Sequence, residues 1–315
     1  MPEKKISQRG MNKIVIVTQK TRLSDLVARY NTVEQARFYI EHMGMSFDEY
    51  IDEDRIYNEA LGAVSRIASE HARVQTVDRD FVPNMLWDRG DVVVALGRDG
   101  LVVNVLKYLD GQPLLGVNPD PSRNDGILLP FSVDDFEVYL KKTLAGAAAS
   151  RAVTMAMART NDGQKLYAVN DLFIGNKTHV SARYEITCKG ETEQQSSSGI
   201  IVSTGLGSSG WYASVIAEAS RISEMFGGRR IEPERRSWDD GRLVFTVREP
   251  FPSRVTGTGI VIGTVDAGDS LVIASKMPAN GVIFSDGIEA DAIEFNSGTE
   301  VTVTVADKSG RLITR

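Results

Sequence analysis

The chain changes its sequence pattern near residue 150, and this change constrains the fold more than any other feature. Before that point, short β-branched apolar runs such as 13–17 and 91–97 alternate with longer segments of helical periodicity. After it, short strand-like runs follow one another, separated by Gly, Asn, Asp and Ser. Strand–helix alternation indicates a mostly parallel sheet covered by helices, whereas many short strands indicate a β-sandwich. We therefore predict an N-terminal α/β domain over 12–150 and a C-terminal β-sandwich-like domain over 151–315.

The expected elements follow from the apolar spacing. In the first domain, four apolar runs are expected to form strands: 13–17, 73–77, 91–97 and 114–118. Helical spacing is expected over 24–71 with a break near 43–46, over 102–109 and over 133–149. In the second domain, one helix is expected over 211–225, after a glycine-rich loop. The charged residues 1–11 lack the apolar stretch of a signal peptide and are expected to form a tail.

Composition argues against several classes of function. The net charge of −6 does not favour a broad nucleic-acid-binding surface. The longest stretch without charges, 199–217, is interrupted by glycines and serines, so no membrane span is expected. The single cysteine, Cys188, cannot form an internal disulfide, which fits a reducing compartment. We therefore expect a cytoplasmic protein whose partners are small molecules rather than nucleic acid or a membrane.

The first candidate site follows the third expected strand, where the turn Gly97-Arg98-Asp99-Gly100 leads into a helix. In an open α/β sheet, ligands bind beyond the carboxyl ends of the strands, and glycines let phosphate oxygens approach amides at a helix N-terminus. Asp99 is then placed to accept a proton from an attacking hydroxyl, as kinase aspartates do. The turn alone leaves a second interpretation equally open, in which Asp99 caps the helix.

Two polar residues, Asn170 and Asp171, interrupt an otherwise apolar strand. The Asn side chain offers a donor and an acceptor to a base or an amide, and the carboxylate can accept hydrogen bonds from both hydroxyls of a ribose. Taken alone, the pair favours a simpler interpretation, a strand end or bulge at which polar side chains satisfy the backbone.

A loop rich in glycine and serine lies between an apolar strand and the helix expected over 211–225. Its candidates for contact with a nucleotide are Ser203, Thr204, Gly207, Ser208 and Ser209. The segment 205–210 also matches G-x-G-x-x-G, with Glu224 at a suitable spacing for a ribose, so a Rossmann-like oxidoreductase is an alternative. No clear parallel strand follows to complete a βαβ unit, which weakens that alternative.

Other patterns point to no competing chemistry. The sequence has no P-loop and no H-E-x-x-H motif, and His42, His71 and His179 lack the carboxylate or cysteine spacing of a metal site. We therefore predict no metal held by side chains of the protein alone. The arginine-rich stretch 227–241 mixes both signs of charge and is typical of a solvated loop, with a phosphate or partner contact as the less favoured alternative.

Taken in order, these segments resemble the NAD kinase family. That family carries a G-G-D-G-T turn, an N-E or N-D pair and an S-T-x-x-G-S loop, which correspond here to 97–101, 170–171 and 203–208. Further segments resemble the mitochondrial-type branch of the family: 116–130, 197–199, 247–255 and 285–287. The resemblance covers nearly the whole chain, and its strength lies in the order of the motifs.

The resemblance implies an NAD kinase-like fold, an α/β domain joined to a β-sandwich with the active site between them. It implies that ATP, with Mg²⁺, phosphorylates the adenosine-ribose 2′-hydroxyl of NAD to give NADP, and that Asp99 is the general base. It also implies a homodimer. The residues expected to contact the nucleotides are Gly97, Arg98, Gly100, Asn170, Asp171 and the loop 203–209.

Two residues depart from the family pattern. Arg98 stands in place of a glycine, and Leu101 in place of a threonine. The Arg98 guanidinium is expected either to clamp phosphate or to obstruct a backbone contact with it. A catalytically silent protein that binds NAD or NADP is therefore a second alternative.

Overall fold

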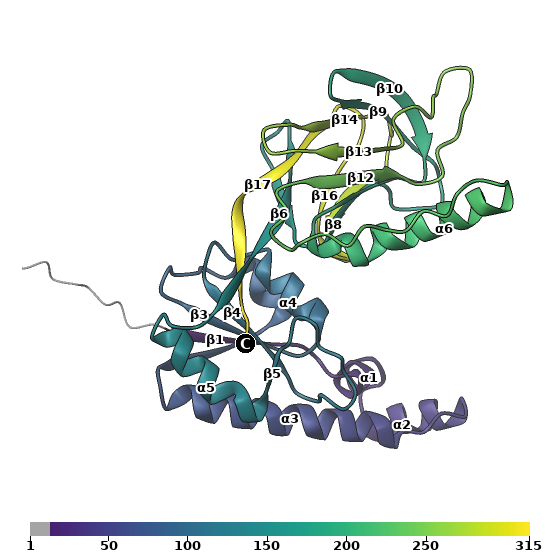
Figure 1. Ribbon diagram of the computed structural model, residues 1–315. Coiled ribbons are helices and arrows are strands. Elements are labelled where there is room, and N and C mark those ends of the chain that lie inside the picture. Colours follow the sequence, from purple (N-terminus) through teal and green to yellow (C-terminus); the bar gives the residue numbers. More distant parts are fainter. Residues whose placement is uncertain (1–12) are drawn as a thin grey trace, which may run out of the picture. The chain divides into compact units, whose positions relative to one another are not determined.

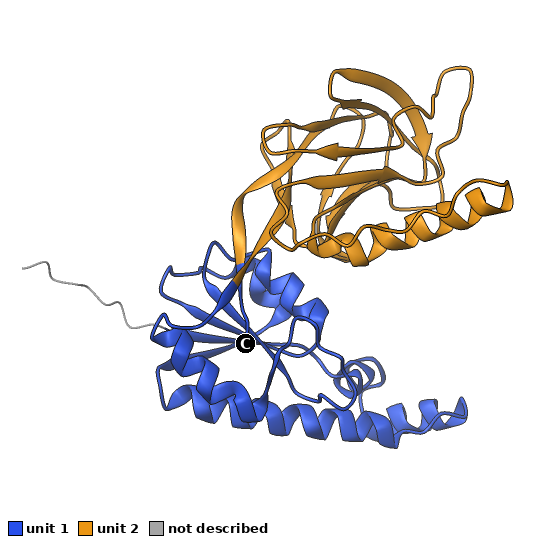
Figure 2. Ribbon diagram, in the orientation of Figure 1, with its two compact units in different colours: residues 1–150, 311–315 blue, residues 151–310 orange. Residues whose placement is uncertain are grey.

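The computed structural model describes residues 13–315, so the tail predicted over 1–11 lies outside the described residues. The chain divides into two compact units, residues 1–150 with 311–315 and residues 151–310 (Figure 2). The sequence placed 151–315 in a single domain, but Arg311 and Leu312 pair with a strand of the first unit. The chain therefore passes from one unit to the other twice.

A parallel sheet forms the centre of the first unit (Figure 1). Its strands, in spatial order, are the end of β17 (Glu300–Ile313), β4 (Pro113–Asn118), β3 (Val92–Leu96), β1 (Lys13–Thr18) and β2 (Arg73–Asp78). The short strand β5 (Phe131–Ser132) also pairs with β4, and every pairing is parallel. All residues of β3 are buried, because helices cover both faces of a parallel sheet, and this explains its uninterrupted apolar run.

Helices α3 (Asp48–Ser69) and α5 (Val133–Leu144) pack on one face of this sheet, around Ile14, Ile16 and Val94. Helix α4 (Asp99–Leu106) contacts β3 and β4. It begins three residues before the predicted range of 102–109, because the G-R-D-G turn already contains its first residue.

The helical tract predicted over 24–71 forms three helices rather than two. Helices α1 (Arg22–Tyr30) and α2 (Val33–His42) share a small apolar cluster with the start of α3. The side chains of Thr21 and Thr32 accept hydrogen bonds from backbone N–H groups and cap α1 and α2, which divides the tract. The 3₁₀ helix η1 (Arg79–Asn84) follows β2.

The second unit contains two antiparallel sheets. The first has the order β10 (Glu191–Ser197), β9 (Ala182–Cys188), β14 (Leu271–Ser275) and β17, with β6 (Ser150–Thr160) beside β17 and β7 (Lys165–Ala168) beside β6. The second has the order β13 (Ile262–Val265), β12 (Leu243–Val247), β11 (Ile200–Ser203), β8 (Asp171–Asn176), β15 (Gly281–Ser285) and β16 (Ile288–Glu294). The prediction of a β-sandwich-like domain is confirmed.

The side chains of β8 alternate between the core of this sandwich and its outer face. Leu172 and Ile174 face the core between the sheets, whereas Phe173 faces outward. On that outer face, the ring of Phe173 stacks on Trp211 of α6 (Trp211–Met225) at 5.6 Å between centroids. Helix α6 has the range that the sequence predicted. Within residues 13–315, none of the helices has the length and apolar character that a bilayer crossing requires.

Candidate functional site

The G-R-D-G turn lies at the carboxyl end of β3, where Arg98 is the N-cap residue of α4 and Asp99 is its first helical residue. The Asp99 carboxylate accepts hydrogen bonds from the backbone N–H groups of Leu128, at 2.9 Å, and Ile127, at 3.2 Å. The alternative in which Asp99 caps the helix is therefore wrong. Its carboxylate instead connects the turn to the loop that precedes β5.

The two glycines of the turn have different surroundings. A Cβ atom at Gly97 would lie 2.9 Å from the side chain of Gln19, so this position is close to β1. A Cβ atom at Gly100 would meet nothing within 4 Å. Because the first turn of a helix has N–H groups without helical partners, the open space at Gly100 leaves room for an anion beside α4.

Two cavities of about 310 Å³ and 430 Å³ lie at the carboxyl ends of β1 and β3. The residues that line both are Gln19, Lys20, Arg22, Glu53 and Arg98. The smaller cavity extends to Arg123, after β4. Carboxylates line the cavities as well, and in the larger one they balance the cations. In the smaller cavity cations outnumber carboxylates, which suits a ligand with phosphate groups at the edge of the sheet where α/β proteins bind ligands. The Asp99 side chain lines neither cavity.

Arg98 and Leu101, which depart from the family pattern, lie in different environments. The Arg98 side chain is 54% exposed, and its Nη2 atom lies 3.1 Å from Oε1 of Glu53. The other carboxylate oxygen of Glu53 pairs with the guanidinium of Arg22. Leu101 is buried, and its apolar side chain forms part of the wall of the larger cavity, where it offers no hydroxyl to a phosphate.

Tyr57 of α3, which the sequence did not single out, holds two strand ends together beside the turn. Its hydroxyl accepts a hydrogen bond from the N–H of Gln19, at 3.0 Å, and donates one to the carbonyl of Leu96, at 3.1 Å. Burial raises the pKa of Tyr57 to about 12, so the hydroxyl remains protonated and can make both bonds. Local sequence carries no signal for this role, because the two partners lie 38 and 39 residues away along the chain.

In the second unit, three strand ends meet at Asn170 and Asp171. Asp171 is the first residue of β8 and is paired with Ser203, the last residue of β11. Strand β15 ends beside them, and its next residue is Asp286. The backbone N–H of Thr204 donates to the Asn170 carbonyl at 2.9 Å, which connects the Ser203 loop to the pair.

The carboxylate of Asp286 fixes the backbone of this pair. It accepts hydrogen bonds from the N–H groups of Val169, Asn170 and Asp171, the shortest of them 2.7 Å from Asn170. The pair does lie at a strand end, as the simpler interpretation predicted. However, it is Asp286, not the side chains of the pair, that satisfies these backbone groups. The sequence offered only the segment 285–287 as a point of resemblance and gave Asp286 no role.

The carboxylate of Asp171 is buried, with 8% of the residue exposed. Burial alone raises the pKa of Asp171 to about 6, with no offsetting cation among the described residues. A buried carboxylate of this kind is stabilised by hydroxyl donors, such as those of a ribose.

The buried hydroxyl groups of the Ser203 loop donate to backbone carbonyls of the protein. Those of Ser203, Thr204 and Ser208 are buried and donate to the carbonyls of Thr204, Val169 and Gly205, respectively. A Cβ atom at Gly207 would lie 2.1 Å from the Asn170 carbonyl oxygen, so this glycine allows a close approach within the chain. Ser209 is exposed. Contact between these residues and a nucleotide stays a prediction.

The strand before this loop excludes the Rossmann-like alternative. Strand β11 pairs with β8 and β12, and both pairings are antiparallel. Helix α6 therefore leads from β11 to an antiparallel neighbour, whereas a dinucleotide-binding βαβ unit requires parallel strands. The match of 205–210 to G-x-G-x-x-G therefore does not indicate a dinucleotide-binding βαβ unit.

Known proteins match both the sequence and the fold. The chain is 23% identical to human NAD kinase 2, mitochondrial, over 317 aligned positions, covering 78% of this chain and 72% of the relative. The rat protein of the same name is 24% identical over 319 positions, covering 78% and 75%. An NAD kinase from Archaeoglobus fulgidus in complex with ATP has a TM-score of 0.53 at 16% identity, covering 96% of this chain and 93% of that chain.

Yeast NADH kinase complexed with NADH has a TM-score of 0.58 at 15% identity, covering 98% of this chain and 84% of that chain. No protein-family model matches the chain. The chain resembles the NAD kinases in sequence and shares their fold. The predicted resemblance is thereby confirmed.

In this NAD kinase-like chain, one residue of the arginine-rich stretch has a structural role. Arg236 is buried, and its guanidinium donates to the carbonyls of Ser203, Thr204 and Arg242 at 2.7–3.1 Å. Its backbone N–H also donates to the Ser208 hydroxyl. The interpretation of 227–241 as a solvated loop is wrong for Arg236, because the loop carbonyls require a donor in the interior.

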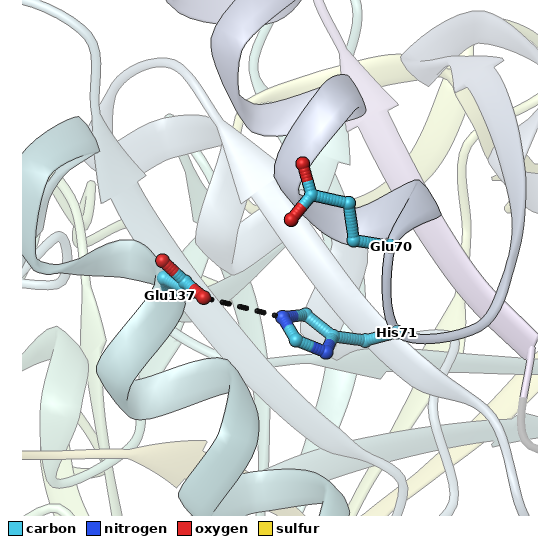
Figure 3. Close-up of side chains that lie close together, drawn as sticks. All are labelled: Glu70, His71 and Glu137. Carbon is cyan, nitrogen blue, oxygen red and sulfur yellow. Dashed lines mark ion pairs between the residues drawn. The ribbon is translucent and has the colours of Figure 1, made fainter.

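Residues 13–315 contain one group of three side chains that could hold a metal, namely Glu70, His71 and Glu137 (Figure 3). The sequence missed it because Glu137 lies on α5, far along the chain from His71. Nε2 of His71 is 3.5 Å from the Glu137 carboxylate, but Nζ of Lys141 is closer, at 2.6 Å. The Lys141 ammonium holds the pKa of Glu137 below its usual range and competes with any metal ion. This group lies at the end of α3 that leads into β2, away from the G-R-D-G turn.

Proposed function

We propose that the protein is an NAD kinase that transfers the terminal phosphoryl group of ATP to the adenosine-ribose 2′-hydroxyl of NAD, giving NADP. The observation that carries this proposal is the G-R-D-G turn at the carboxyl end of β3, beside cavities lined by several cationic side chains. An edge of this kind suits a polyphosphate chain. The human and rat relatives, both named NAD kinase 2, mitochondrial, support the same activity.

Asp99 acts as the general base in this proposal. The ribose hydroxyl oxygen forms a bond to the terminal phosphorus, the bond from that phosphorus to the bridging oxygen breaks, and ADP leaves. The hydroxyl proton passes to the Asp99 carboxylate. Each carboxylate oxygen already accepts one backbone hydrogen bond and retains a further acceptor position.

Magnesium enters as part of the ATP substrate. The three-residue group found among residues 13–315 does not include any side chain of the G-R-D-G turn. Mg²⁺ commonly retains water and binds through substrate phosphates with only one or two carboxylates, so the turn needs no larger cluster. The chemical contribution of Mg²⁺ is to neutralise charge on the phosphates.

The second unit binds the dinucleotide in this proposal. Asp171 accepts hydrogen bonds from ribose hydroxyls, and the half-buried Asn170 side chain contacts a base or an amide. Arg236 and Asp286 hold the surrounding loops in place through backbone groups. Ser209 supplies the exposed hydroxyl of the Ser203 loop.

The test is to incubate the protein with ATP, Mg²⁺ and NAD and to measure NADP with an NADP-specific dehydrogenase. Asp99→Asn should lower turnover by at least about a hundredfold, the usual contribution of a positioned general base. NAD affinity should change little, because the general base acts mainly in the transition state, whereas a purely structural role would disturb binding and turnover together. Near-normal turnover in the variant would refute the assignment of Asp99.

The structure also sets a condition on that variant. Asn offers one carbonyl oxygen where Asp99 accepts from two backbone N–H groups, so one of these loses its partner. The loss is expected to cost about 1–3 kcal/mol of folding stability. Turnover must therefore be measured well below the melting temperature of the variant, determined on the same sample.

A catalytically silent dinucleotide-binding protein is the second candidate, and the two backbone hydrogen bonds on Asp99 favour it, since they give the carboxylate a structural role in holding the loop before β5. NAD would then raise the melting temperature without forming NADP. We further propose a homodimer, tested by sedimentation equilibrium. We propose a cytoplasmic location from the single cysteine, Cys188, tested by cell fractionation.

A further inference from the structure

A carboxylate lies between two guanidinium groups in the cavities of the first unit. Oε1 of Glu53 is 3.1 Å from Nη2 of Arg98, and its Oε2 pairs with Nε of Arg22. We call these three side chains the Arg22–Glu53–Arg98 bridge. They come from the start of α1, from α3 and from the G-R-D-G turn, so packing of three separate elements brings them together.

The Arg22–Glu53–Arg98 bridge forms a wall that the two cavities share, because all three side chains line both. Lys20 lines both cavities and Arg123 the smaller one, and each of these cations pairs with a carboxylate, Asp80 and Asp120, respectively. Two guanidinium groups on one carboxylate make the contacts that they would make with the oxygens of a phosphate group. Glu53 therefore occupies the position of an anionic ligand.

The two arginines differ in how firmly they are held. The Arg22 guanidinium lies over the ring of Tyr50, 4.5 Å from its centroid, so stacking fixes its orientation. Arg98 is more exposed than Arg22, at 54% against 43%. The Glu53 side chain is 19% exposed, but both of its partners reach solvent, so each ion pair contributes modest stability and a phosphate with more negative charge can replace the carboxylate.

We propose that Arg22 and Arg98 form a subsite for the phosphoanhydride chain of the phosphoryl donor, and that Glu53 is an internal competitor which the donor displaces. This inference rests on the proposed function and adds to it the residues that bind the donor. It also gives Arg98 a role at a position where the family has a glycine. The chemistry recognised is a chain of linked phosphates, which ATP and inorganic polyphosphate share.

Binding of inorganic tripolyphosphate, measured by calorimetry at low salt, tests the subsite without any turnover. Glu53→Gln keeps the size of the side chain and removes the competing charge, so it should bind tripolyphosphate about fivefold more tightly, a modest factor because the groups are partly exposed. The matched control is Glu59→Gln, which removes an exposed ion pair with Arg55 from the same helix and should leave affinity unchanged. Arg98→Gly and Arg22→Gln should each weaken binding by at least about fivefold.

Equal or weaker binding by Glu53→Gln would overturn the proposal, since Glu53 would then only position the arginines. Unchanged binding by Arg98→Gly would overturn it as well. The melting temperature of each variant identifies any that is misfolded. If either Arg22→Gln or Arg98→Gly fails to fold, the other still tests the subsite. Tripolyphosphate binding as expected without NADP formation would reject the proposed function while leaving the anion subsite in place.

A kinetic arm distinguishes the two sources of phosphate. In the NADP assay, Glu53→Gln should lower the KM of the natural donor about fivefold, with ATP and inorganic polyphosphate compared in parallel. The donor whose KM falls is the one that the subsite serves. If neither KM falls, Glu53 does not compete with the donor and the proposal is wrong.

Discussion

Replacing the buried carboxylate of Asp171 by an amide is expected to stabilise the second unit and to impair dinucleotide binding. Burial raises the pKa of Asp171 from its usual value of 3.8 to about 6. The folded state therefore binds this proton more tightly than the unfolded state. Stability from this residue is highest below about pH 4, where both states are protonated, and is lost as the pH rises through about 6.

The size of the effect follows from that shift. Each pKa unit corresponds to 1.36 kcal/mol, so a rise from 3.8 to about 6 corresponds to about 3 kcal/mol lost when Asp171 is ionised. Asp171→Asn has no charge to bury. Its stability relative to the natural protein should thus be unchanged below about pH 4 and rise by up to about 3 kcal/mol above about pH 6. This is an upper limit, because the amide must also be buried.

The assay is urea unfolding of both proteins across this pH range. Asp162→Asn is a control of opposite sign, because hydrogen bonds from Thr160 and Gln164 lower the pKa of that exposed carboxylate. Relative to the natural protein, Asp162→Asn should lose stability above the unfolded-state pKa of 3.8, where the natural carboxylate is ionised in both states, rather than gain it. If Asp171→Asn gave no gain at neutral pH, or the same pH profile as the natural protein, the reasoning about burial would be refuted. If NAD affinity stayed unchanged, Asp171 would not be a ribose contact.

The remaining predictions concern residues that position the two candidate regions. Tyr57→Phe leaves the Gln19 N–H and the Leu96 carbonyl without a partner and should cost about 1–3 kcal/mol in urea unfolding, with a raised donor KM; an unchanged free energy of unfolding would contradict this. Gly100→Ala has space for its methyl group and should fold at least as well as the natural protein, since Ala favours helix. A raised donor KM in this variant would locate phosphate at the start of α4, and an unchanged KM would exclude phosphate there. Arg236→Lys cannot reach three carbonyls with one ammonium and should lower the melting temperature and NAD affinity together, measured by thermal shift and calorimetry; if neither fell, Arg236 would not hold the loop.

Local pattern was sufficient for the elements and for the order of the candidate motifs. The apolar run of β3 shows burial on both faces, and the periodicity of 211–225 gave α6 with its observed bounds. These features depend on residues a few positions apart, where spacing reflects helix or strand geometry directly. The resemblance of the motifs to the NAD kinases likewise needed only their order along the chain.

Tertiary structure alone decided what each side chain contacts. The partners of Asp99 lie 28 and 29 residues away, and Asp286 holds backbone groups 115 to 117 residues earlier. Arg236 belongs to a stretch that is mostly exposed, and its hydrogen bonds to the carbonyls of Ser203 and Thr204, more than thirty residues earlier, explain its burial. Local spacing carries no information on such contacts. They arise because the packed interior requires a partner for each buried polar group, wherever along the chain that partner lies.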